Sequence, residues 1–157
     1  MIGFARVRRM PLVQGDDVDT ALRDLARADA FTGASSPEGA RAGLLLYAGC
    51  WSAAHAVAQD LPTPEGSYWH AILHRQEPDA WNAGYWFRKV GKHPVYPALC
   101  TAAVEFGYAA GKVWDAERFV EFCEQARARP GSAMERIAIE VQHAEWALLF
   151  DWCSRPA

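Results

Sequence analysis

Three polar residues, His70, His74 and Glu77, have a spacing that suits metal or acid–base chemistry. On a helix, at 100° per residue, His74 lies about 40° to one side of His70 and Glu77 about 20° to the other, so all three share one face. Two histidines four residues apart can bind one ion, because their rings point the same way one turn apart. The spacing therefore predicts half of a divalent metal site, with zinc, iron or nickel as candidate ions.

A third ligand has to come from another helix, and His55 is the candidate. Its segment precedes that of His70 by one short connection, so we expect the two helices to be antiparallel neighbours. With a metal ion, two or three histidines would be ligands and a glutamate would act as base toward a bound water. Without one, a His–Glu pair would act as general acid and base. The candidate catalytic residues are Glu77, Glu145 and His93.

The histidine pattern leaves other interpretations open. Ala71 stands where a zincin would carry its general base, so the H-x-x-x-H pair is not that motif. The three histidines are similar to those of DinB-like metal-binding bundles, in which the lone histidine lies much further away in sequence. One alternative is a polar helix face whose histidines hydrogen-bond carboxylates or carbonyls, and another is a pocket without metal. These alternatives together are favoured over the metal site.

The last helical segment contains a second polar set. Glu140 and His143 match the E-x-x-H element of di-iron bundles, but those proteins need two such elements. Glu145 lies on an otherwise apolar stripe, so its carboxylate should be partly buried and paired with Arg, His or a Trp N–H. A structural ion pair is favoured over a catalytic role for Glu145.

A third set surrounds Pro78 and could bind a small-molecule ligand. Arg75 and Arg88 flank this turn, so both could hold a carboxylate or phosphate. The favoured alternative is a local network in which these arginines pair with acidic neighbours. The candidate substrate-binding residues are Arg75, Asp79, Asn82, Trp86 and Arg88.

The elements that position these residues are expected to be helices. Alanine is abundant and β-branched residues are scarce, which favours an all-α fold, a single domain formed by a bundle of about seven helices. Capping residues followed by proline or acid predict several helix starts. Residues 1–15 are expected to be extended or flexible. The predicted helices cover residues 17–29, 37–60, 64–76, 80–90, 97–109, 115–128 and 133–153, with 37–60 and 133–153 at the centre.

Composition narrows the function class. The 157 residues carry a formal net charge of -3, which argues against a nucleic-acid partner. The longest apolar stretch is too short for a membrane span, and no signal-peptide pattern is present. The four cysteines have no paired spacing and are typical of a reduced, cytoplasmic protein. No phosphate-binding loop or nucleophile elbow is found.

A longer pattern resembles the signature of a family of uncharacterised bacterial proteins. Residues 69–94 read W-H-x-x-x-H-R-x-E-P-D-x-x-N-A-x-Y-W-F-R-x-V-G-x-H-P. The likeness extends to W-x-x-x-H-x-x-x-Q at 51–59 and to E-V-Q-x-x-E-W-x-L-L-F-D at 140–151. The resemblance brings no activity, substrate or cofactor. It implies a shared set of polar residues: His55, Gln59, His70, His74, Arg75, Glu77, Asp79, Asn82, Arg88, His93 and Glu145.

Two functions follow as hypotheses. The first is a small enzyme or small-molecule-binding protein whose polar pocket is lined by these His, Glu and Arg residues. The second is a non-catalytic interaction or structural protein of helical-hairpin type, since Ala71, Ala83, Phe87 and Val90 fit single positions of a tetratricopeptide unit. A homodimer is compatible with either.

Overall fold

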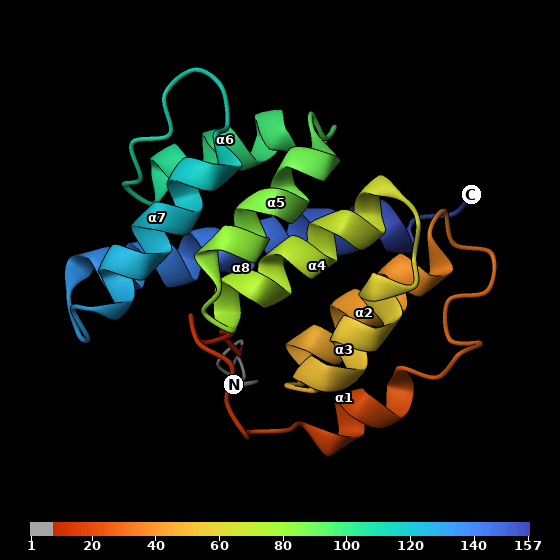
Figure 1. Ribbon diagram of the computed structural model, residues 1–157. Helices are drawn as coiled ribbons and strands as arrows, with labels where there is room; N and C mark the ends of the chain where they lie inside the picture. Colours follow the sequence, from red (N-terminus) through yellow and green to blue (C-terminus); the bar gives the residue numbers. More distant parts are fainter. Residues whose placement is uncertain (1–7) are drawn as a thin grey trace, which may run out of the picture.

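The computed structural model describes residues 8–157, and within that range the chain is all-helical, with no named strand. The predicted all-α class is therefore confirmed, with eight helices in the described part where about seven were expected (Figure 1). They are α1 (Thr20–Leu25), α2 (Pro37–Tyr47), α3 (Trp51–Gln59), α4 (Pro64–Gln76), α5 (Ala80–Val90), α6 (Tyr96–Glu105), α7 (Ala116–Arg127) and α8 (Ala133–Ser154).

The helix starts follow the capping residues. Thr63, Asp79, Asp115 and Ser132 each accept a hydrogen bond from the backbone N–H three residues further along. Each bond satisfies one of the free N–H groups at a helix start. Ser36 makes no such bond, and α2 begins there with proline in its first turn. The connections from α3 to α5 are short, so the sequence itself places the histidine-bearing helices next to each other.

The single helix expected over 37–60 is wrong, because the chain divides it into α2 and α3 at Gly49. Gly49 has a φ of +86°, a left-handed conformation that L side chains rarely adopt. A Cβ at this position would also lie 2.3 Å from the carbonyl oxygen of Asp17. The break redirects α3, so that His55 lies on a helix with an orientation of its own rather than on a continuation of α2.

The first helix is much shorter than the predicted 17–29. None of the six residues of α1 is buried, so no apolar face extends it beyond Leu25. Residues 1–7 of the predicted extended segment lie outside the described residues. Residues 8–15 contain no helix, and they are held by a hydrogen bond from the Gln14 N–H to the Gln76 carbonyl and by burial of Met10 and Leu12.

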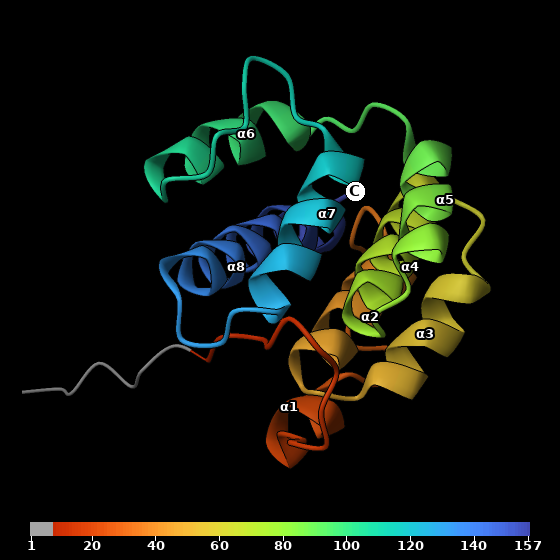
Figure 2. The ribbon, with the colours of Figure 1, turned by 60° about the vertical axis from the view of Figure 1, so that its left-hand side comes forward.

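The centre of the fold is formed by α4 and α8, which cross in the middle of the molecule (Figure 1). Nine of the 13 residues of α4 are buried, whereas α3 buries only Ala54 and Ala58, so the expectation of a central 37–60 segment holds for α2 but not for α3. One half of α8 packs with α6 and α7, and the other packs with α2 and bonds α4 through Tyr68 and Arg75. The core is accordingly divided into two clusters (Figure 2).

Among residues 8–157, no helix combines the length and the apolar character that a membrane crossing requires. All four cysteines are unpaired, in agreement with the sequence-based prediction.

Candidate metal centre

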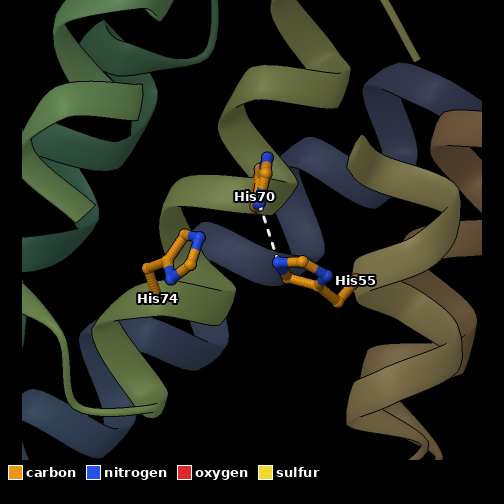
Figure 3. A group of neighbouring side chains, drawn as sticks. All are labelled: His55, His70 and His74. Carbon is orange, nitrogen blue, oxygen red and sulfur yellow. Dashed lines mark hydrogen bonds between the residues drawn. The ribbon is translucent and has the colours of Figure 1, made fainter. Parts of the chain in front are cut away.

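The structure brings His55, His70 and His74 together. One ring nitrogen from each lies within 4.8 Å of the corresponding nitrogens of the other two. The Nε2 atoms of His55 and His70 are 2.9 Å apart, and a nitrogen of His74 is turned toward the same point (Figure 3). His55 comes from α3 and the other two from α4, as the sequence predicted. The cluster is therefore a meeting point of two helices rather than one polar helix face.

Two tryptophans hold the rings of this cluster in place. The Trp51 ring stacks on His55, with centroids 5.0 Å apart, and its Nε1 donates a hydrogen bond of 3.0 Å to the Leu73 carbonyl on α4. This bond links α3 to α4 one turn before His55. On the other side, the Trp86 ring from α5 lies over His70, with centroids 4.0 Å apart. Both contacts restrict the ring orientation that a metal ligand needs.

The surroundings of the cluster keep the imidazoles of His55 and His70 neutral. Burial, together with the neighbouring His55, His74 and Lys89, lowers the pKa of His70 to about 4. Burial, and then His74, also lowers the pKa of His55. At neutral pH both rings are therefore uncharged, and an uncharged imidazole is the form that binds a metal ion.

Glu77 fixes the tautomer of His74. Its Oε2 lies 2.7 Å from Nδ1 of His74, so that nitrogen carries the proton and donates it to the carboxylate. The other ring nitrogen, Nε2, is the one turned toward His70 (Figure 3). A carboxylate on the far nitrogen of a ligating histidine is the usual support in metal sites. Glu77 is therefore placed to orient the His74 ring. Its catalytic role stays a prediction.

The spacing of the three nitrogens is close to what a tetrahedral ion requires. Zinc–nitrogen bonds of about 2.0–2.1 Å place two ligand nitrogens about 3.3 Å apart. The His55–His70 distance of 2.9 Å would have to open by about 0.4 Å, and the other distances would close by no more than about 1.5 Å, since none exceeds 4.8 Å. Small ring rotations supply such shifts. His55 is half-buried, which leaves the cluster reachable from solvent.

Glu145 lies away from this cluster and forms a buried ion pair. Its side chain is fully buried, and its Oε2 accepts a 2.5 Å hydrogen bond from Nη2 of Arg75, whose side chain is 1% exposed. The Tyr68 hydroxyl donates to Oε1 at 3.1 Å. The guanidinium lies over the Phe119 ring, with its central carbon 4.8 Å from the centroid. The predicted pairing of Glu145 with an arginine is confirmed, and neither charge faces solvent.

The set around Pro78 is dispersed rather than joined into one ligand site. Arg88 pairs with Glu117 on α7 at 2.7 Å instead of with a neighbour at the turn. Asp79 caps α5 and also accepts from the Asn82 side-chain amide at 2.7 Å. The expected pairing of these arginines with acids of the turn is therefore wrong. Helix packing places Glu117 of α7 next to Arg88 and Glu145 of α8 next to Arg75.

His93 is also separate from the histidine cluster. It is 4% exposed and its Nε2 lies 3.5 Å from a carboxylate oxygen of Glu65. Burial lowers the pKa of His93, although Glu65 opposes that shift. Trp51 was not among the predicted site residues, although its spacing of four residues from His55 is the signal that places the two rings together.

Comparisons with known protein families, with curated proteins and with solved structures gave no match.

Proposed function

We propose that this protein is a divalent-metal-dependent enzyme, in which His55, His70 and His74 hold the ion and the reaction is hydrolysis of a small molecule. The observation that carries the proposal is the convergence of three imidazole nitrogens from two helices within 4.8 Å. The Nε2 atoms of His55 and His70 are 2.9 Å apart. Each neutral imidazole has one N–H donor, so this contact uses only one of the two donors of the pair. An ion would use both lone pairs.

Each neighbouring residue has a definable task in this proposal. Glu77 keeps His74 in the tautomer that presents Nε2, and Trp51 and Trp86 hold the rings of His55 and His70. The Lys89 ammonium lies 4.5 Å above the Trp86 ring and adds positive charge near His70, which suits a substrate with a negative group. A zinc ion held by these three histidines would supply a bound water molecule with a pKa of about 7.

Metal content tests the proposal directly. Purified, untagged protein, as isolated and after incubation with zinc, iron(II) or nickel salts, would be analysed by inductively coupled plasma mass spectrometry. We expect about one ion per chain. The His70→Ala/His74→Ala double variant should lose it, and His143→Gln, which changes a histidine outside the cluster, should keep it. Absence of metal from the wild-type protein under all these conditions would reject the proposal.

The role of Glu77 has its own test. Glu77→Gln removes the charge that orients His74 but leaves all three ligands, so zinc affinity should fall about 10- to 100-fold. The affinity is measured by competition with a chromophoric chelator. Hydrolysis of nitrophenyl acetate and nitrophenyl phosphates by the zinc-loaded protein then tests catalysis. Metal binding with no hydrolysis of any such substrate would retain the site and reject the enzyme.

A second candidate is a non-catalytic binding protein, and the outer face of α5 favours it. Trp81 is 74% exposed, and its ring lies nearly parallel to that of Tyr85, which is 39% exposed. Exposed aromatic side chains of this size are typical of contact surfaces. The unpaired cysteines support a cytoplasmic location for either function.

A further inference from the structure

A pocket of about 740 Å³ lies beside α6, and none of its lining residues belongs to the histidine cluster. One wall is the outer side of α6, including Cys100, Thr101 and Val104, and the other is the 111–114 segment of the loop that leads to α7. Figures 1 and 2 show this loop projecting beside α6. The volume of the pocket is in the range of small-molecule sites, about 300–1,000 Å³.

The pocket wall contains a buried hydrogen-bond donor that no described residue satisfies. Trp114 lines the pocket and is only 6% exposed, yet its indole Nε1 has no acceptor among residues 8–157. An indole N–H removed from water without an acceptor destabilises the folded protein. The Nε1 atom is itself covered, so an acceptor atom of a ligand in this pocket would satisfy it once the indole ring turns toward the pocket.

Charge around the pocket favours an anion. Two cationic residues, Lys92 and Lys112, and one carboxylate, Glu105, line the pocket, so its charged groups sum to one positive charge. Within the described part of the chain, none of these three makes an ion pair. The two ammonium groups are thus free to bind a ligand. Val104 and Val113, which are 54% and 78% exposed, add an apolar surface at the same place.

We propose that this pocket is a second binding site, and that its ligand is a molecule with an apolar body and one carboxylate, of the fatty-acid type. The apolar chain lies against Val104, Val113 and the rings of the pocket wall, and the carboxylate binds Lys92 and Lys112. The carboxylate oxygens are the acceptors available to Trp114. The site is independent of the histidine cluster and of any ion held there.

Fluorescence of dansyl-labelled undecanoate, titrated with the full-length protein, tests the site. Dodecanoate should displace the probe and dodecanol should displace it at least about tenfold more weakly, since only the acid forms charge-assisted bonds. The Lys92→Gln/Lys112→Gln variant should weaken dodecanoate binding about tenfold and leave dodecanol unchanged. An Arg118→Gln/Arg129→Gln variant, matched in charge, should bind like wild type.

Filling the pocket provides the steric test. Thr101→Trp and Val104→Trp place an indole in the pocket from partly exposed positions and should abolish probe binding, whereas Ala98→Trp on the same helix but outside the pocket should not. Binding should persist in the His70→Ala/His74→Ala variant, which separates this proposal from the metal site. Equal displacement by acid and alcohol, or undiminished binding by both pocket-filling variants, would overturn it.

Discussion

Replacing Glu145 by glutamine is expected to cost about 3–5 kcal/mol of unfolding free energy, the usual cost of breaking a buried ion pair by removing one partner. The side chains of Glu145 and Arg75 are 0% and 1% exposed, so water cannot solvate the guanidinium left behind. Nε and Nη1 of Arg75 already lack acceptors among the described residues, which leaves Glu145 and Gln142 as the partners of the remaining nitrogen.

A matched control exists on the surface. Arg88 and Glu117 are 2.7 Å apart, but their side chains are 53% and 48% exposed. Water screens this pair, so Glu117→Gln should cost no more than about 1 kcal/mol. The two variants make the same chemical change in the same kind of pair, and only burial differs.

Urea unfolding followed by circular dichroism at pH 7 gives both free energies, and thermal unfolding should show a decrease of roughly 6–20 °C for the buried variant. An Arg75→Met/Glu145→Leu double variant should be more stable than Glu145→Gln, because it leaves no unpaired charge in the core. If Glu145→Gln costs no more than Glu117→Gln, the stated reason, an uncompensated buried cation, is wrong.

Two further predictions concern local structure. The hydrogen bonds from the Asn82 backbone and side chain lower the pKa of Asp79 from its ordinary value of 3.8. Its cap should therefore stabilise the protein fully above that ordinary value and lose the effect as pH falls through the lowered pKa. In urea unfolding, Asp79→Ala should cost about 1 kcal/mol at pH 7 and progressively less as the carboxylate is protonated. Gly43→Ala should destabilise the protein by about 1–3 kcal/mol, because its Cβ would lie 2.6 Å from the Trp69 ring. Gly84→Ala meets only the ends of the Arg88 and Glu117 side chains and should be neutral or stabilising. Thermal unfolding measures both, and equal effects would contradict the packing argument.

Local features of the fold were predictable from sequence because they depend on neighbouring residues. Helix starts at Thr63, Asp79 and Ser132 follow from side chains that bond the next turn. The break at Gly49 is not predictable in this way, because its left-handed backbone conformation and its close approach to Asp17 depend on the packing of distant segments.

The sequence by itself determined the shared helix face of His70 and His74, since 100° per residue requires it, and it indicated His55 as a neighbour through a short connection. Only the tertiary structure decided that the three nitrogens converge within 4.8 Å, because this depends on how α3 turns after Gly49 and on how Trp51 bonds α4. It likewise placed Arg75 against Glu145, 70 residues away, instead of beside Glu77. A periodic pattern gives the direction of a side chain, but its partner depends on the packing of distant helices.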